Sequence, residues 1–299
     1  MHIPDGFLAT PVWLALDVGA APAVGLLARR ARQDFDESRI PLLGVMGAFV
    51  FAAQMVNFPV APGASGHLVG SALLAYTLGP AAASLVMTAI LVIQAFVFQD
   101  GGVLALGANI FNMAIAGVLA AHLPYRLLGG RRMGVFLGGM LSVLVGAFLA
   151  LGQLLLSGIP MKPELLALSA GLFFVNAAAE GVITVAALGA IRGIRPGWVQ
   201  EISPPGKREL WLFGGAAVAL AVFGVLIASP LPDGLERFLE EAGVAARAKA
   251  LITTPFGDYE AAFFRAGWLR KAAAGLAGLA LISACGWATG RWLARRRRA

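Results

Sequence analysis

The chain begins with Met1-His2, whose nitrogen atoms can chelate a divalent transition metal. The terminal amine and the His2 amide nitrogen close a five-membered ring on a metal ion, and that amide and Nδ1 of the His2 ring close a six-membered one. One more ligand would complete the nitrogen square that suits Ni(II) or Cu(II). Pro4 and Asp5-Gly6 keep the segment out of a helix or strand. A Met-His start also arises by chance, so a fourth ligand is needed to support a metal site.

His67 is the predicted fourth ligand. The chain has 3 histidines, and in the topology derived below His2 and His67 lie on the same side of the membrane, whereas His122 lies at the inner end of its span. A neutral imidazole and a deprotonated His2 amide would hold the cation, so binding should release protons and strengthen as pH rises. The alternative for His67 is a polar surface position at the start of a helix.

Several polar residues near the outer ends of the spans could orient these ligands, because metal-bound histidines usually donate their other ring N–H to a polar partner. A spacing of three residues, which recurs in two pairs, places each pair on one helix face. Hydrogen bonding between helices is the alternative. Asp100 could attract a cation or cap a turn. The candidates are Gln54, Asn57, Ser65, Asn109 and Asn112.

Two acidic residues fall inside predicted spans. Placing an unpaired carboxylate in the bilayer costs free energy, so such a residue is first interpreted as functional. The two residues are Glu180 and Asp17. Asn176 lies four residues before Glu180 on the same face and offers it one hydrogen bond. We therefore assign neither carboxylate a metal role.

The composition is that of a membrane protein. Hydrophobic residues make up 59% and charged residues 13%, with a mean hydropathy of +0.81, whereas a soluble domain is roughly half apolar and a quarter charged. The 38 glycines fit closely packed membrane helices. The net charge is +7, and the basic residues lie between the apolar segments and at the C-terminus. This placement indicates that they set the orientation of the protein in the membrane, and we expect no nucleic-acid partner. Cys285 is a single cysteine and offers no thiolate site.

The apolar segments predict an all-α polytopic protein with about nine transmembrane helices, since a span needs about 20 residues. We expect spans near 8–29, 40–58, 67–79, 81–98, 103–123, 134–156, 164–191, 209–228 and 270–290. The 67–79 span is short, which in transporters points to a binding site.

Basic residues set the orientation, because they concentrate in cytoplasmic loops. With the N-terminus outside and the C-terminus in the cytoplasm, the inner side carries Arg29, Arg30, Arg32, Arg39, Arg126, Arg131, Arg132, Arg192, Arg195, Lys207, Arg208, Arg291 and Arg295 to Arg298. A proline-rich break near 196–208 divides the chain into a metal-binding unit of about seven helices, residues 1–200, and a unit of two helices, residues 201–299. The latter flank an outer loop, 229–269, with a helical pattern over 235–250 and a turn at 255–257.

The sequence contains no phosphate-binding loop, no His-Glu-x-x-His and no paired cysteines. We therefore expect that the chain is not an enzyme and that it does not hydrolyse ATP by itself.

The chain resembles the CbiM/NikM family, the substrate-specific membrane components of energy-coupling factor transporters for cobalt and nickel. The resemblance spans about residues 1–200 and rests on three motifs, Met1 to Phe7, Ser65-Gly66-His67-Leu68 and Leu106 to Met113. A fourth, Pro232-Asp233-Gly234-Leu235-Glu236, resembles the start of the PDGLE domain of the small N component. One position differs, because the family often has a histidine before Glu180, where this chain has Asn176.

The resemblance implies metal ligation by the amine of Met1, the amide and ring of His2, and the ring of His67. It implies a multi-pass protein of a bacterial or archaeal cytoplasmic membrane that works with a transmembrane coupling subunit and two ATP-binding subunits. Ni(II) or Co(II) is then the transported substrate and no cofactor is permanently bound; the fused PDGLE segment favours nickel. The alternative is a self-contained secondary transporter or channel in which Asp17 and Glu180 relay ions.

Overall fold

The computed structural model describes residues 1–194 and 206–295, and this part of the chain is almost entirely helical. Seven helical segments are long and apolar enough to cross a membrane, as expected for a multi-pass membrane protein. Each coincides within a few residues with a predicted span. They are α1 (Thr10–Asp34), α4 with η2 (Pro80–Ile93, Gln94–Phe98), α5 with η3 and α6 (Leu106–Asn109, Ile110–Gly117, Val118–Leu127), α7 (Arg132–Leu156), α8 (Pro163–Ile194), α10 with η4 and α11 (Lys207–Ala219, Leu220–Gly224, Val225–Ile227), and α13 (Gly267–Ala294).

The other two predicted spans are shorter than expected. After a single 3-10 turn η1 (Glu37–Arg39), α2 (Ile40–Gln54) has 15 residues, and α3 (Ser71–Leu78) has 8, which at 1.5 Å per residue reach about 22 and 12 Å. The chain between them forms an antiparallel hairpin of β1 (Phe58–Ala61) and β2 (Ala64–Gly66). The count of nine spans therefore stays a prediction.

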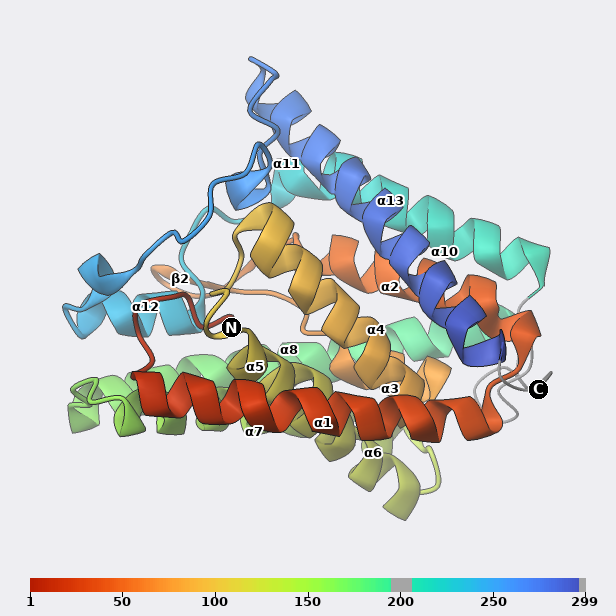
Figure 1. Cartoon of the computed structure of the whole chain (residues 1–299), viewed down its shortest axis with the longest axis horizontal. Helices are drawn as coiled ribbons and strands as arrows, with labels where there is room; N and C mark the ends of the chain where they lie inside the picture. The colour runs from red at the N-terminus through yellow and green to blue at the C-terminus, as the bar shows by residue number, and fades with distance from the viewer. Residues whose placement is uncertain (195–205, 296–299) are drawn as a thin grey trace.

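The start of α1 and the end of α13 lie toward opposite ends of the molecule, and the amino terminus lies in its interior (Figure 1). The amino terminus folds back inward from the start of α1, beside β2, whereas α1 ends, α10 begins and α13 ends at the opposite end. There Arg32 of α1 stacks on the ring of Trp292 of α13, 3.3 Å from its centroid. The end of α1, the start of α10 and the end of α13 therefore share one end of the molecule.

The C-terminal helices α10 and α13 pack against α2. Small residues make this possible: a Cβ at Gly286 of α13 would lie 2.6 Å from the Cα of Gly44 in α2. Such close backbone approach is how membrane helices gain packing energy without a hydrophobic driving force between them. The contact fixes the two C-terminal helices to the N-terminal bundle.

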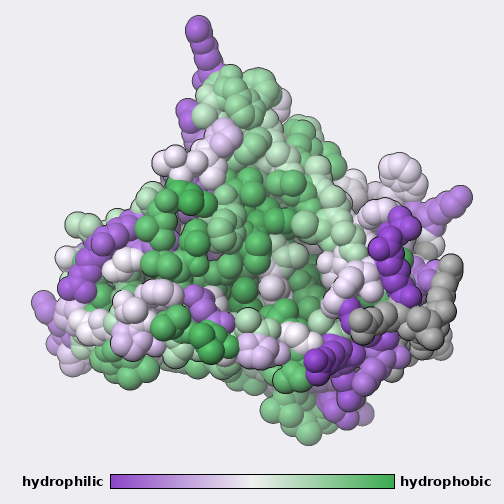
Figure 2. Space-filling model, in the orientation of Figure 1, coloured by the Kyte–Doolittle hydropathy of each residue, from purple (hydrophilic) through white to green (hydrophobic). Residues whose placement is uncertain are grey.

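Large apolar side chains cover the outside of the long helices, as in Val18, Phe148, Trp211 and Ile227, which are exposed. Figure 2 shows hydrophobic residues across the middle of one face and hydrophilic residues mainly toward its edges. An exposed apolar band between polar ends is the surface that a lipid bilayer requires.

Three of the long segments contain π-helical turns, which often accompany functional positions. Between α11 and α13, the chain forms the short helices α12 (Gly234–Glu241), η5 (Ala245–Arg247) and η6 (Gly257–Tyr259). The expected helix over 235–250 is thus wrong in length, because it ends at Glu241, with Gly243 in a left-handed conformation just beyond. The predicted break at 196–208 lies mostly outside the described residues.

Candidate metal site

The first eight residues are held inside the molecule by hydrogen bonds to the segment that begins α5. The Ile3 N–H donates to Asn109 Oδ1 (2.9 Å) and the Asn109 amide donates back to the Ile3 carbonyl (3.1 Å). The Asp5 carboxylate accepts from the N–H groups of Val103 and Leu104, both at 2.8 Å. Met1, His2 and Ile3 are buried. Asp5 was predicted only to form part of a turn, and its role as an acceptor for this helix start was missed.

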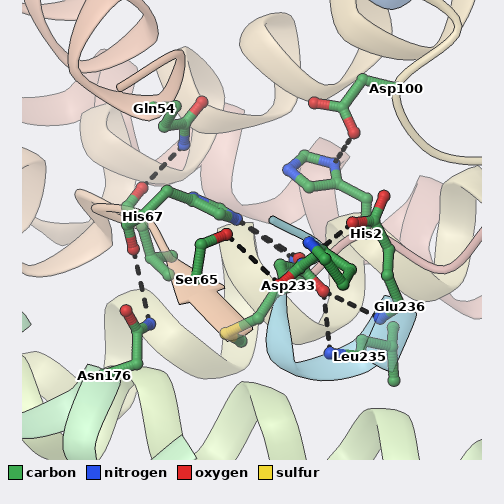
Figure 3. A network of polar contacts seen from close by, with 12 residues as sticks. His2, Gln54, Ser65, His67, Asp100, Asn176, Asp233, Leu235 and Glu236 are labelled. Carbon is green, nitrogen blue, oxygen red and sulfur yellow. Dashed lines mark hydrogen bonds and ion pairs between the residues drawn. The ribbon is translucent and has the colours of Figure 1, made fainter. Parts of the chain in front are cut away.

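The buried amine lies next to His67, although 66 residues separate them (Figure 3). The Met1 nitrogen is 3.2 Å from Nε2 of His67. On the other side of that ring, Nδ1 lies 3.0 Å from the carbonyl oxygen of Leu68. With the Nδ1 proton donated to this carbonyl, Nε2 presents its lone pair toward the amine, the tautomer that a metal ligand needs.

The backbone that carries His67 is fixed from three sides. Gln54 donates to the Val69 carbonyl (2.7 Å), and Asn176 donates to the His67 carbonyl (3.4 Å). The Glu180 carboxylate accepts from the N–H groups of Val69 (2.7 Å) and Gly70 (2.8 Å) at the start of α3. The expected Asn176–Glu180 bond is therefore wrong, because both side chains bind the chain next to His67.

Asp233, the residue that precedes α12, reaches the same point from the C-terminal unit. Its Oδ2 forms an ion pair with the Met1 amine and lies 3.7 Å from Nε2 of His67. Burial alone would raise the pKa of Asp233, but the positive charge of the Met1 amine pulls it well below its usual range. The carboxylate is therefore charged at neutral pH.

His2 completes the set of ligands expected at the amino terminus. Burial lowers the pKa of its ring from 6.5 to about 4, partly offset by Asp100, so the ring is neutral at pH 7. Its Nδ1 lies 3.8 Å from the Asp100 carboxylate, and its Nε2 is buried without a hydrogen-bond partner among the described residues.

A cavity of about 290 Å³ opens beside these residues. It is lined by His2 and His67 and by four acidic residues, of which one comes from the N-terminal unit and three come from the C-terminal loop. No lysine or arginine is among the lining residues in the described part of the chain. A cavity with acidic walls concentrates cations. The acidic residues are Asp100, Asp233, Glu236 and Asp258.

A relay of hydrogen-bonded side chains runs beside this cavity from Gln54 to Asp100. Gln94 donates to Gln54 Oε1 (2.9 Å) and to the Tyr259 hydroxyl (3.0 Å), and that hydroxyl donates to Asp100 Oδ2 (2.5 Å). The Tyr259 ring stacks on Phe98. Burial and Asp100 raise the pKa of Tyr259 well above its usual value, so it stays a donor. This relay was missed because nothing in the sequence marks Gln94 or Tyr259.

The other predicted orienting residues have different partners. α2 ends at Gln54, so Asn57 lies beyond the helix, and the predicted helix face shared by Gln54 and Asn57 is wrong. Asn57 lines the cavity. Asn112 exchanges two hydrogen bonds with Gln153 and contacts neither histidine through a hydrogen bond among the described residues. The Ser65 hydroxyl donates to the Leu231 carbonyl at 2.6 Å and so holds the C-terminal loop.

The position of the Asp17 carboxylate is also explained by a backbone hydrogen bond, which it accepts from the N–H of Gly107 in α5 at 2.7 Å.

In the described residues, no three His, Cys, Asp or Glu side chains form a metal-binding group. The arrangement thus depends on the amine and a backbone amide, which such side-chain clusters do not include. It can bind a small cation, and it has no nucleophile paired with a base.

Comparison with known proteins agrees with this organisation. Residues 2–198 match the CbiM family model, described as the cobalt uptake substrate-specific transmembrane region, and residues 207–295 match the PDGLE domain. The fused nickel transport protein NikMN of Rhodobacter capsulatus is 31% identical over 333 aligned positions, covering 95% of each chain.

Other relatives match about two thirds of the chain. The cobalt transport protein CbiM 1 of Pelobacter propionicus is 33% identical, covering 64% of this chain and 90% of its own. The crystal structure of a truncated transition metal transporter superposes with a TM-score of 0.58 at 32% identity, covering 65% of this chain and 99% of its own. The chain therefore belongs to the CbiM/NikM family and carries a PDGLE domain C-terminal to its CbiM region.

Proposed function

We propose that this protein is the substrate-capture component of an energy-coupling factor importer for Ni(II) or Co(II). The observation that carries the proposal is the buried amine of Met1, 3.2 Å from Nε2 of His67, beside a neutral His2 and a cavity with acidic walls. Two nitrogens at that separation, each about 2.1 Å from a shared ion, subtend an angle of about 100°. This is close to adjacent corners of a square, the geometry that suits Ni(II).

In this proposal the hydrated cation enters the acidic cavity and binds the amine, the amide and ring of His2, and the ring of His67. Closing the chelate draws Nδ1 of His2 away from Asp100. The amine and the amide must lose protons, so binding strengthens as pH rises. Gln54, Ser65, Asn109 and Glu180 hold the two ligand-bearing segments in place, whereas Asn112 supports the bundle through Gln153.

Nickel is the favoured substrate, because four nitrogens in a plane suit Ni(II) better than Co(II). The match to a fused nickel transport protein over nearly the whole chain supports the same choice. We propose that the N-terminus faces outside, that the metal-binding unit ends near residue 200, and that separate coupling and ATP-binding subunits supply the energy.

The experiment compares purified protein with its native start against the same protein with its Met1 amine acetylated. Ni(II) and Co(II) are titrated into each by calorimetry. Acetylation converts the amine into an amide and so removes it as a ligand, together with its five-membered chelate ring, and binding should be lost. Protein taken through the same procedure without the acetyl donor is the matched control and should bind as the native protein does. Equal binding by the acetylated and control proteins contradicts the site.

Energy coupling is tested separately by metal accumulation in cells. Uptake should require co-expression of the coupling and ATP-binding subunits. Uptake by this chain alone would favour the secondary transporter, in which Asp17 and Glu180 relay ions. That alternative has less support, because both carboxylates accept hydrogen bonds from backbone N–H groups at the starts of short helices.

A further inference from the structure

Asp233 divides its two carboxylate oxygens between two tasks. Oδ1 accepts from the N–H groups of Leu235 (2.7 Å) and Glu236 (2.9 Å) and so caps α12, while the Glu236 side chain accepts from the Asp233 N–H (2.9 Å). This reciprocal arrangement is a capping box. Oδ2 takes no part in the cap and instead faces the Met1 amine.

The loop that carries Asp233 is fixed to the metal-binding unit by backbone bonds. The Ser65 N–H donates to the Pro232 carbonyl at 2.8 Å, Ser65 and Asp233 form a parallel β-bridge, and the Ser65 hydroxyl holds Leu231. Ser65 lies two residues before His67. One short stretch of backbone therefore positions both a predicted metal ligand and the carboxylate beside it.

We propose that Asp233 is a fifth, oxygen ligand of the transported metal, supplied by the PDGLE domain. This rests on the proposed function. Oδ2 touches the Met1 nitrogen and lies 3.7 Å from Nε2 of His67, so it borders any ion that these two nitrogens share. It is buried, it carries a negative charge, and its cap on α12 holds it in this position.

A fifth ligand bears on which metal the site accepts. Four nitrogens in a plane satisfy Ni(II), whereas Co(II) gains more from additional oxygen ligands. Asp233 therefore broadens the site from Ni(II) toward Co(II). The nitrogen ligands come from the N-terminal unit and the oxygen ligand from the C-terminal unit, so metal binding involves both units.

The test uses the full chain with D233N and D233S. Asparagine and serine are both good helix N-caps, so α12 keeps its cap, but the first replaces Oδ2 with an amide nitrogen and the second is too short to reach the amine. E240Q, an exposed position on α12, is the matched control. Each protein is titrated with Ni(II) and Co(II), and the coordination number of bound Ni(II) is measured by X-ray absorption spectroscopy.

We expect both Asp233 variants to bind Co(II) about 10–100-fold more weakly, the size seen when a supporting group of a metal site is lost, with a smaller loss for Ni(II). Bound Ni(II) should lose one oxygen neighbour and gain the pre-edge feature of a square-planar site. Tighter binding in D233N would show that the carboxylate only competes with the metal for the amine, and an unchanged spectrum would likewise overturn the proposal. If the native protein binds neither ion, the proposed function fails instead.

Discussion

The N-terminal and C-terminal units differ sharply in where they place polar side chains. Among the described residues, all but one of the buried polar and charged side chains belong to residues 1–194, and the exception is Asp233. The buried faces of α10 and α13 consist of small and apolar residues, as in Ala217, Gly278 and Ile282. The N-terminal unit therefore builds the site, while the helices of the C-terminal unit serve to hold a loop against it.

The largest effect expected from this comparison is at His67. H67A removes one nitrogen ligand and should weaken Ni(II) binding by at least about 100-fold, roughly 3 kcal/mol at 1.4 kcal/mol per tenfold change. H122A, which changes the histidine of α6 outside the site, should bind Ni(II) as the native protein does. Calorimetry on both variants checks this, and equal affinities would remove His67 from the site.

Acid should destabilise the N-terminal unit through His2. Because its pKa is lowered from 6.5 to about 4 in the folded protein, the unfolded chain binds the extra proton, and stability is lost as pH falls from about 6.5 toward 4. At about 1.4 kcal/mol per pKa unit the loss is about 3 kcal/mol. The melting temperature measured across this range should fall, and less steeply in H2Q.

The lowered pKa of Asp233 acts in the same direction but at lower pH. Its contribution to stability is present above the ordinary aspartate pKa and is lost as pH falls below it. A melting temperature that is flat between pH 6.5 and 4 in the native protein would contradict the burial of His2.

Glu180 should act on the site without touching the metal. E180Q leaves one acceptor for two buried N–H groups, and an unsatisfied buried donor costs about 1–3 kcal/mol. Because these groups follow His67, Ni(II) affinity should fall about tenfold with an unchanged X-ray absorption spectrum. E164Q, an exposed position on α8, is the matched control. If E180Q changes the spectrum, the residue is nearer to the metal than a positioning role requires.

A smaller effect is expected where the C-terminal loop closes the cavity. Y259F removes the hydroxyl shared by Gln94 and Asp100, and the loss of one net hydrogen bond, about 1 kcal/mol, should weaken Ni(II) binding a fewfold. Y125F, whose ring stacks on Tyr76 away from the cavity, should have no effect on affinity. Identical affinities in both variants would show that the relay is dispensable.

The smallest effect on affinity should come from the C-terminal helices. G286A inserts a Cβ within 2.6 Å of the Gly44 Cα, so α13 must shift from α2 and the melting temperature should fall. Ni(II) affinity should stay within about twofold, provided that the loop stays attached to Ser65. A large loss of affinity in G286A would show that the helices contribute more to the site than their apolar faces indicate.

The long helices could be predicted because each is a continuous apolar segment of sufficient length. The end of α2 at Gln54 could not, because Asn57 looks like the next residue on the same helix face until the hairpin is seen. The partners of Glu180 and Asp17 were also missed. Both carboxylates bind backbone N–H groups, which every residue except proline carries, so no side chain in the sequence identifies the acceptor's partner. The approach of Asp233 to Met1 depends on a fold that joins residues 232 positions apart.

The attachment of both ends of the C-terminal loop to helices packed on α2 has a consequence for assembly. A loop held this way meets the amine at an effective concentration in the millimolar range, independent of how much protein the cell makes. A PDGLE domain on a separate chain would have to find its partner by diffusion in the membrane, and the fraction of complete sites would vary with the abundance of both chains. In this protein every folded chain carries its own carboxylate to the amino terminus, so the supply of both units is matched one to one by translation.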